Sequence, residues 1–125
     1  MKKITLLLSN DNSIELVINN KRERSSIAVE GREYVADNLF DALLLLRERL
    51  ESNNVKILCT GSRYDVYPSR MSIQMSNGRK AYQLTLGKQA EENDVVDIFT
   101  PASVEQIGTV ADQRAFYKRW IESLR

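Results

Sequence analysis

Alternation of apolar and polar residues is the feature that most limits what this chain can fold into. It is clearest in residues 71–86, where alternation runs up to Asn77 and Gly78 and then resumes. Side chains spaced by two share one face of a β-strand. Asn-Gly is the preferred pair for a type I′ turn, because it tolerates two positive φ angles. Residues 71–86 are therefore predicted to form a β-hairpin with Ile73 opposite Tyr82.

Two further hairpins are predicted near the N-terminus from the same alternation. In the first, a three-residue loop at residues 10–12 places Leu6 opposite Leu16, with the neighbouring aliphatic residues on the same face. The second runs through residues 26–35 and turns at its Glu-Gly pair.

Two short apolar stretches, residues 55–59 and 94–99, are predicted to be additional strands. The order of the strands stays open at this stage. They fit one antiparallel sheet, or a mixed sheet in which residues 55–59 lie parallel to an earlier strand across a helix.

Two amphipathic helices are predicted, over about residues 37–52 and 111–124. Asp37 is the predicted N-cap of the first helix, whose wide leucine stripe indicates burial in the core or, as the alternative, a partner surface. The second helix carries an aromatic arc that is predicted to pack on the core. The fold class is therefore α+β: a mostly antiparallel sheet built from hairpins, with two main helices, in a single domain over residues 1–125. The stripe comprises Leu39, Leu43, Leu46 and Leu50, and the arc comprises Phe116, Tyr117, Trp120, Ile121 and Leu124.

Residue usage excludes several kinds of site. The chain has no histidine, so it cannot form a Ser-His or Cys-His catalytic pair or a histidine zinc site. Its one cysteine, Cys59, cannot form an intrachain disulfide, which favours a reducing, cytoplasmic compartment. The 18 Lys and Arg residues nearly balance 17 Asp and Glu residues, so a global basic field for nucleic acid is not expected. The apolar run Ile4 to Leu8 is too short for a signal peptide or a membrane span.

No catalytic, metal or cofactor site is predicted. Only three residues separate Cys59 from Arg63, too few for a phosphate-encircling phosphatase loop, so a buried cysteine and a turn are expected. An acidic run near residue 94 lacks the ligand spacing and glycine of a calcium loop and is predicted to be a solvated loop. That run contains Glu91, Glu92, Asp94 and Asp97.

Residues 63–88 combine five basic residues with three tyrosines and only one acid. Three interpretations fit: an ordinary solvated surface, a protein-binding surface, or a surface for nucleic acid. The acidic run that follows makes the local charge dipolar, which favours a protein partner over a phosphate backbone.

The sequence GSRYDVYPSRMSIQMSNGRKAYQLTLGKQA, followed by VVDIF and a C-terminal FYKRWIESL, resembles the immunity proteins of bacterial contact-dependent growth inhibition systems. The matching features are the GSR turn, the Ser-Met pair, the glycine turn before RKAY and the VDIF strand, in the C-terminal half of the chain. The resemblance implies a bacterial cytoplasmic protein that binds the C-terminal domain of its cognate toxin, often a nuclease, without catalysis. The partner-binding surface it implies comprises Arg63, Tyr64, Asp65, Tyr67, Arg70, Arg79, Lys80 and Tyr82.

The functional expectation is therefore a non-enzymatic immunity protein, a monomer or weak dimer, that touches neither nucleic acid nor membrane directly. The alternative is a structural or regulatory adaptor that self-associates through the leucine-rich helix or a sheet edge. A third hypothesis, an enzyme using Asp65 and Arg63, requires a carboxylate with a strongly perturbed pKa in a concave site.

Overall fold

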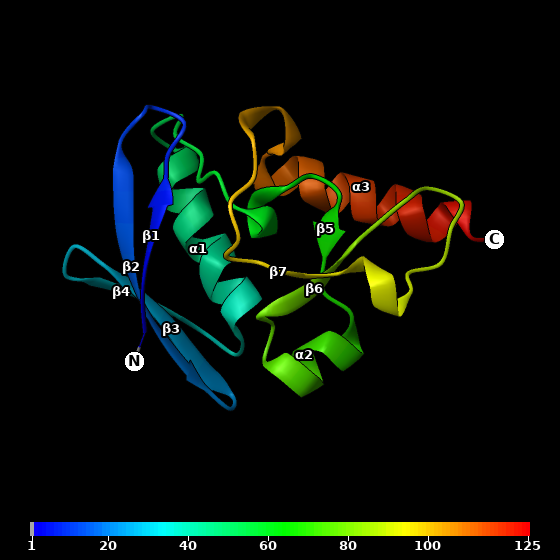
Figure 1. The fold of residues 1–125 in the computed structure, drawn as a ribbon, viewed down its shortest axis with the longest axis horizontal. Coiled ribbons are helices and arrows are strands. Elements are labelled where there is room, and N and C mark those ends of the chain that lie inside the picture. Colours follow the sequence, from blue (N-terminus) through cyan, green and yellow to red (C-terminus); the bar gives the residue numbers. More distant parts are fainter. Residues whose placement is uncertain (1) are drawn as a thin grey trace.

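In the computed structural model, which describes residues 2–125, the N-terminal alternation folds into a four-stranded antiparallel meander (Figure 1). Its strands are β1 (Lys2–Leu7), β2 (Ser13–Lys21), β3 (Arg24–Val29) and β4 (Arg32–Ala36), and they lie in chain order. The apolar residues of the alternation face the helix that follows, so one face of this sheet forms much of the core.

Both N-terminal hairpins are confirmed, but the first has a different register from the predicted one. Leu6 lies opposite Ile14 instead of Leu16, because the connection is longer than three residues. The amide of Leu8 donates to the carbonyl of Asn12 at 2.8 Å, and Asp11 adopts a positive φ of 70° inside this loop. A shift of two residues keeps every side chain on its predicted face.

The leucine-rich segment forms α1 (Leu39–Glu51), and its N-cap is Asn38, so the prediction of Asp37 was wrong by one residue. The Asn38 side chain accepts the Asp41 amide proton at 2.9 Å, which satisfies a free donor of the first turn. Most of the stripe is buried against β3 and β4, which confirms the core interpretation, while Leu50 is half-buried. The stripe residues with almost no exposure are Leu39, Leu43 and Leu46.

The predicted hairpin at residues 71–86 is wrong in its first half, which forms the helix α2 (Arg70–Ser76). Ser69 and Ser72 cap each other's backbone amides, at 3.0 and 2.8 Å, in a capping box that starts the helix. Asn77 and Gly78 then adopt φ values of 56° and 82° and end it. The Asn-Gly pair is thus a helix terminator here and not a type I′ turn.

The second half of that segment forms β6 (Lys80–Gln83), the central strand of a second antiparallel sheet with β5 (Val66–Tyr67) and β7 (Val95–Asp97). The strand predicted at residues 94–99 is thus confirmed in shortened form. The strand predicted at 55–59 is reduced to two isolated antiparallel bridges, Ile57 with Leu8 and Cys59 with Pro101. The Cys59 amide donates to the carbonyl of Ile57, two residues back, so the chain turns there. The two sheets are separate, and neither is mixed.

The predicted C-terminal helix is α3 (Val110–Ser123), preceded by short 3₁₀ turns η1 (Thr60–Ser62), η2 (Glu92–Asp94) and η3 (Val104–Gln106). Only Val110 and Gln113 of α3 are fully buried, so its aromatic arc packs on the core only in part. Half-buried are Phe116, Tyr117, Trp120 and Ile121, and Leu124 is exposed. Within residues 2–125, no helix combines the length and apolarity that crossing a membrane requires.

A buried arginine connects α1 to α3. Arg47 is 3% exposed, and its guanidinium donates to Gln113 Oε1 at 2.7 Å and to the carbonyls of Gly61 at 3.3 Å and Gly108 at 3.1 Å. Gln113 Nε2 in turn donates to the carbonyls of Gly61 and Arg63. Burial lowers the pKa of Arg47. This network fixes the segment leading into β5 beneath α3, and so it positions the surface described next.

Candidate protein-binding surface

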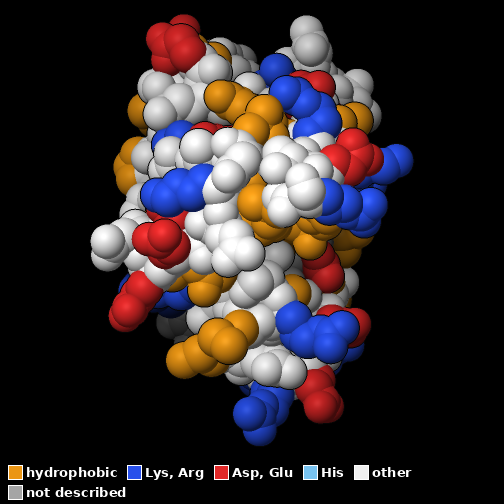
Figure 2. Space-filling model, turned by 90° about the vertical axis from the view of Figure 1, so that its right-hand side faces the viewer, with side chains coloured by type: hydrophobic (Ala, Val, Ile, Leu, Met, Phe, Trp, Pro, Cys, Tyr) orange, Lys and Arg blue, Asp and Glu red, His pale blue; other side chains and the backbone are white. Residues whose placement is uncertain are grey.

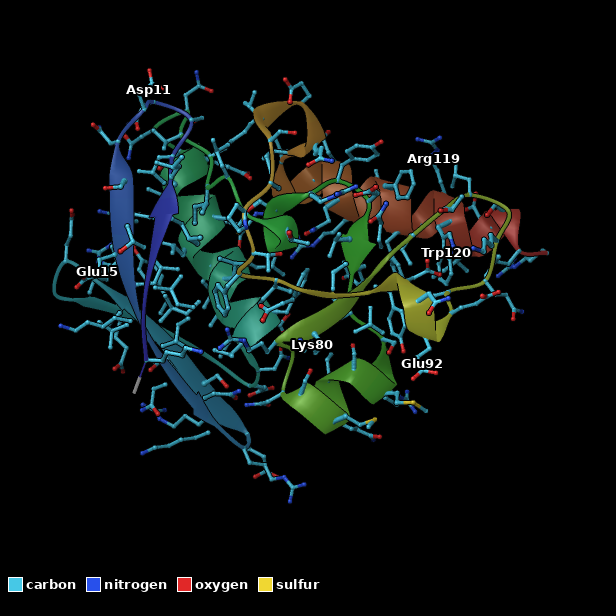
Figure 3. The ribbon with its side chains drawn as sticks, in the orientation of Figure 1. Asp11, Glu15, Lys80, Glu92, Arg119 and Trp120 are labelled. Carbon is cyan, nitrogen blue, oxygen red and sulfur yellow. The ribbon has the colours of Figure 1, made fainter. Side chains whose placement is uncertain are left out.

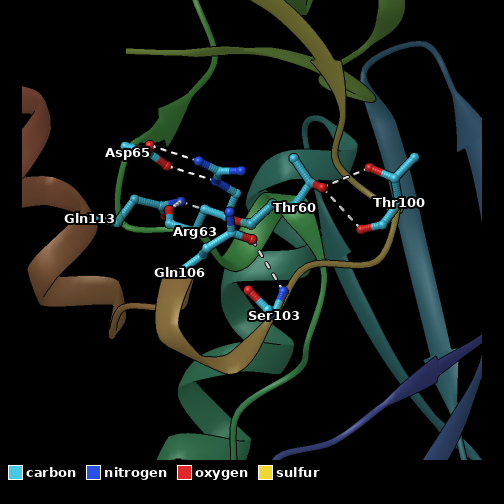
Figure 4. Close-up of polar contacts among 8 residues, drawn as sticks. Thr60, Arg63, Asp65, Thr100, Ser103, Gln106 and Gln113 are labelled. Carbon is cyan, nitrogen blue, oxygen red and sulfur yellow. Dashed lines mark hydrogen bonds and ion pairs between the residues drawn. The ribbon is translucent and has the colours of Figure 1, made fainter. Parts of the chain in front are cut away.

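The eight residues predicted to bind a partner lie in different environments, and two of them, Arg63 and Asp65, pair with each other within the chain. Arg63 and Asp65 form a bidentate ion pair with both nitrogen–oxygen distances at 2.9 Å (Figure 4). Their side chains are 17% and 10% exposed. The hydrogen bonds to Asp65 raise the pKa of Arg63. The pair stabilises the turn before β5, and its charges are directed at each other rather than outward.

Arg79 and Lys80 are directed toward Asp97 on β7. The Nε atom of Arg79 lies 3.2 Å from Asp97 Oδ2, and Lys80 Nζ lies 3.9 Å from the same oxygen. The guanidinium of Arg79 also lies over the Phe99 ring, 5.3 Å from its centroid. These basic residues therefore support the edge of the second sheet.

Tyr67 and Tyr82 do come together, as directly opposed residues of β5 and β6. The Tyr67 ring stacks on that of Tyr117 from α3, with centroids 4.1 Å apart and planes inclined by 15°. Its other neighbour is Phe40, in an edge-to-face contact at 5.5 Å. Burial raises the pKa of Tyr67, and the nearby positive charge of Arg114 offsets part of that rise.

Trp120 extends this aromatic group toward the C-terminus of α3. Its ring centroid lies 6.0 Å from that of Tyr117, and its indole nitrogen donates to the carbonyl of Lys88 at 2.9 Å. The amide of Gly87 donates to the Ser123 hydroxyl at 2.8 Å, so the loop after β6 is tied to α3 at two points. Figure 3 shows Trp120 and Arg119 on different sides of the helix.

These side chains enclose a pocket of about 270 Å³, which we call the aromatic pocket. Met71 of α2 forms part of its wall and is 61% exposed. Of the eight predicted residues, only Tyr67 and Tyr82 line it, while Arg70 adjoins it as the neighbour of Met71. The full lining is Tyr67, Pro68, Ser69, Met71, Tyr82, Leu84, Ala90, Tyr117 and Trp120.

The remaining predicted residue, Tyr64, lies in a second aromatic group on another side of α3. Tyr64 is 42% exposed, and its ring meets that of Phe116 edge-on at 5.2 Å. Arg119 lies over the Phe116 ring at 5.7 Å. These residues border a shallow depression of about 470 Å³ that includes Gly108. Tyrosine, arginine and phenylalanine side chains displayed in this way are typical of protein interfaces.

A larger open cleft of about 1150 Å³ separates α2 from the tip of the β2–β3 hairpin. Its lining is mainly polar. The side-chain Nδ2 of Asn77 donates across it to Asn20 Oδ1 at 2.8 Å and to the Lys21 carbonyl at 2.7 Å. These bonds attach α2 to the first sheet. The lining of the aromatic pocket is mainly apolar and has less internal hydrogen bonding, so this pocket is the stronger candidate for binding.

The cysteine and the acidic run, the other groups that could take part in chemistry, have structural roles. Cys59 is fully buried beside Ser62, and burial raises the pKa of its thiol. In the acidic run, the Glu91 amide donates to Asp94 Oδ2 at the start of η2, and Glu91 and Glu92 are exposed, as predicted for a solvated loop. Asp97 departs from that prediction, because it is half-buried on β7 and pairs with Arg79. Within residues 2–125, no three His, Cys, Asp or Glu side chains group closely enough to hold a metal ion.

Searches for similar proteins returned no match, either among protein-family models or among curated protein sequences.

Sequence reasoning missed the contribution of α2 and α3 to the pocket. It placed Met71 in a strand and Tyr117 and Trp120 in the core. A usable signal was present for α2: serines at positions 69 and 72 are typical of the start of a helix.

Proposed function

We propose that this chain is a non-catalytic binding protein that neutralises the C-terminal domain of a cognate bacterial toxin, for which a nuclease is the expected activity. The observation that supports it best is the aromatic pocket, a preformed hollow whose walls combine tyrosine, tryptophan and methionine. The toxin as partner rests on the resemblance of residues 61–90 to immunity proteins. The absence of histidine from the sequence limits the catalytic alternatives and agrees with a binding role.

The pocket suits tight binding because its walls are ordered before a partner arrives. Tyr67 stacks on Tyr117 and meets Phe40 edge-to-face, and Trp120 is held by its bond to the Lys88 carbonyl. A rigid aromatic surface loses little conformational entropy on association. Tyrosine and tryptophan are also the residues that most often dominate binding energy at protein interfaces.

The test is to co-express the chain with the product of the gene directly upstream of it, which is the expected position of a cognate toxin. The wild-type chain should restore growth and co-purify with the toxin in equal amounts. Met71→Glu should lose both effects because it places a charge in the pocket wall. Met75→Glu is the matched control: Met75 is 81% exposed on the same helix and lies outside the pocket.

Each outcome has a distinct meaning. If the wild-type chain neither protects nor co-purifies, the toxin-neutralising function is wrong. If it does both, and Met71→Glu does so equally well, the function stands but the pocket is not the interface.

One alternative function keeps a specific observation in its favour, namely an adaptor that self-associates through a sheet edge. β1 is an edge strand of the first sheet, and its Leu7 side chain is 60% exposed, although the Leu7 carbonyl already accepts the Leu58 amide. Sedimentation at several concentrations separates the two hypotheses: a dimer that persists on dilution favours the adaptor, and a monomer favours the inhibitor.

A further inference from the structure

We propose that Asn77 is a site of spontaneous deamidation, and that its conversion to aspartate or isoaspartate releases α2 from the first sheet. Asparagine is a chemically labile residue, and Asn77 is the only asparagine in the chain that a glycine follows. Gly78 has no side chain to shield its amide nitrogen, so this nitrogen is well placed to attack the asparagine side chain. The modification needs no enzyme and no partner, so it is independent of the binding function proposed above.

The reaction balances with water as its only co-reactant. The main-chain nitrogen of Gly78 loses its proton and attacks Cγ of Asn77, so a nitrogen–carbon bond forms and closes a five-membered succinimide ring. The bond between Cγ and Nδ2 breaks, and Nδ2 leaves as ammonia with that proton. Water then opens the ring at one of its two carbonyl groups. The product is aspartate or, where the main chain now runs through Cγ, isoaspartate.

The leaving nitrogen, Nδ2 of Asn77, is also the atom that attaches the end of α2 to the first sheet. It donates to Asn20 Oδ1 at 2.8 Å, to the Lys21 carbonyl at 2.7 Å and to Ser25 Oγ at 2.6 Å. All three acceptors belong to the hairpin of β2 and β3. Loss of this one nitrogen therefore removes three hydrogen bonds between α2 and the first sheet.

The carboxylate that replaces the amide cannot restore all of these bonds. Ser25 can still donate its hydroxyl proton, and the Asn20 amide can rotate to present its NH₂ group. The Lys21 carbonyl has no proton to donate, so it would face a negatively charged oxygen where it now accepts a hydrogen bond. Aspartate at position 77 therefore weakens the attachment of α2.

Isoaspartate also disturbs the main chain. It adds one carbon to the backbone next to Gly78, which is buried. A Cβ atom on Gly78 would already lie 2.7 Å from Asn38 Oδ1 and 2.9 Å from the amide nitrogen of Phe40. The carbonyl of Asn77 also accepts the Leu39 amide proton at 2.8 Å. A longer backbone therefore shifts the contacts that join the end of α2 to the start of α1.

Burial of side chains contributes little to holding α2 in place. Its seven residues are fewer than the roughly 12–15 that an isolated helix needs in water. Ser72 is its only buried residue, whereas Met71 and Met75 are 61% and 81% exposed. Figure 2 shows this end of the molecule, where hydrophobic side chains are exposed in separate patches. Since Met71 forms part of the wall of the aromatic pocket, release of α2 also opens that wall.

The folded state slows the reaction without preventing it. Asn77 has φ and ψ values of 56° and 36°, and closure of the succinimide ring requires a different ψ. The end of α2 must therefore detach before the ring can form. The rate of deamidation follows the fraction of molecules in which α2 is detached, so a variant that weakens the attachment should deamidate faster.

The test follows the tryptic peptide of residues 71–79 while the folded protein is incubated in mildly alkaline buffer. Chromatography and mass spectrometry separate its asparagine, aspartate and isoaspartate forms. Deamidated forms should accumulate in wild type, at least about tenfold more slowly than in a synthetic peptide of the same sequence. Asn20→Ala removes one exposed acceptor and should raise the rate about two- to twelvefold, the effect of one hydrogen bond. Asn19→Ala is the matched control: its side chain points to the other face of β2, so the rate should not change.

Hydrogen–deuterium exchange measures the release of α2. In Asn77→Asp and in the aged, deamidated wild type, the amides of α2 should exchange at least about tenfold faster than in fresh wild type. The amides of β1 should keep their rates. The aged protein folds before it is modified, so it gives the result even if Asn77→Asp fails to fold.

Three results would contradict the proposal. The first is an unmodified Asn77 in folded wild type and in folded Asn20→Ala while the synthetic peptide deamidates. The second is an equal rate of deamidation in wild type and Asn20→Ala. The third is unchanged exchange of α2 in the deamidated protein. Deamidation at Asn77 that is faster in Asn20→Ala and is followed by faster exchange of α2 supports it, whether or not the chain neutralises a toxin.

Discussion

The rings of Tyr67 and Tyr117 lie 4.1 Å apart and nearly parallel, and this contact joins the second sheet to α3. Tyr67 comes from the short strand β5, while Tyr117 lies at the middle of a helix whose aromatic arc is only half-buried. The contact therefore serves both the stability of the helix and the shape of the aromatic pocket.

The first prediction concerns the energy of this pair. In a double-mutant cycle with Tyr67→Ala and Tyr117→Ala, the coupling energy should be about 0.5–1.5 kcal/mol, as for other aromatic pairs. The free energy of unfolding in urea measures it for the four proteins. If the losses of stability in the two single variants simply add up in the double variant, the two rings lie close together without stabilising each other.

The second prediction concerns the end of α2, where Gly78 has a φ of 82° and lies close to the N-cap of α1. A Cβ atom there would lie 2.7 Å from Asn38 Oδ1 and 2.9 Å from the Phe40 amide nitrogen. Gly31 has a similar φ of 81° but nothing within 4 Å of such an atom. Gly31→Ala should therefore cost about 1 kcal/mol from backbone strain alone.

Gly78→Ala should cost clearly more than Gly31→Ala, because the added methyl group displaces the helix cap as well. Thermal and urea unfolding of the two variants provide the comparison. Equal losses of stability would mean that α1 and α2 are not packed as closely as the distances indicate.

The third prediction concerns the buried arginine. Arg47→Ala removes the donors that Gln113 Oε1 and two backbone carbonyls use, so it should lower the free energy of unfolding by about 3 kcal/mol. Arg49→Ala is the control, since Arg49 is exposed on the same helix. It should stay within about 0.5 kcal/mol of wild type. A similar loss in both variants would rule out the network as the cause.

The fourth prediction concerns pH and Cys59. Burial raises the pKa of this thiol in the folded state, so the unfolded chain loses its proton first as pH rises. The stability from the protonated thiol is complete below the unfolded pKa, roughly 8.5, and falls as pH rises toward the folded value. Cys59→Ala should therefore lose less stability than wild type between about pH 8 and pH 10. A thiol reagent should label wild type only on unfolding, and rapid labelling of the native protein would contradict this account.

The sequence predicted the first sheet well because three local signals agree there. Alternation, turn residues and the following leucine helix all require the same face of β1 to β4 to be buried. The predicted register of the first hairpin was wrong by two residues, because the loop hydrogen bond between Leu8 and Asn12 is not apparent from residue spacing.

The α2 region failed because one residue pattern fits two structures. Residues 70–76 alternate like a strand, yet the Ser69 and Ser72 capping box and the Asn77 and Gly78 terminator both favour a helix. Alternation over seven residues does not outweigh two capping signals. The same error hid the pocket, since Met71 reaches Tyr117 and Trp120 only when this segment is helical.

The predicted partner-binding residues differ in whether their side chains are already paired within the chain. Charge and residue type do not reveal which side chains pair internally, and Arg63 with Asp65, or Arg79 with Asp97, are satisfied within the chain. The structure places Tyr67 opposite Tyr82 on β5 and β6, where the sequence had predicted Ile73 as the partner of Tyr82.

The most direct test of the central claim is the affinity of the purified toxin domain for wild type, Trp120→Ala and Leu7→Ala, measured by calorimetry. Leu7 is 60% exposed on the first sheet and serves as the control. We expect Trp120→Ala to weaken binding about 30-fold or more, as for an interface residue worth at least about 2 kcal/mol, and Leu7→Ala to bind like wild type. Wild-type affinity in Trp120→Ala would contradict the assignment of the aromatic pocket as the binding site.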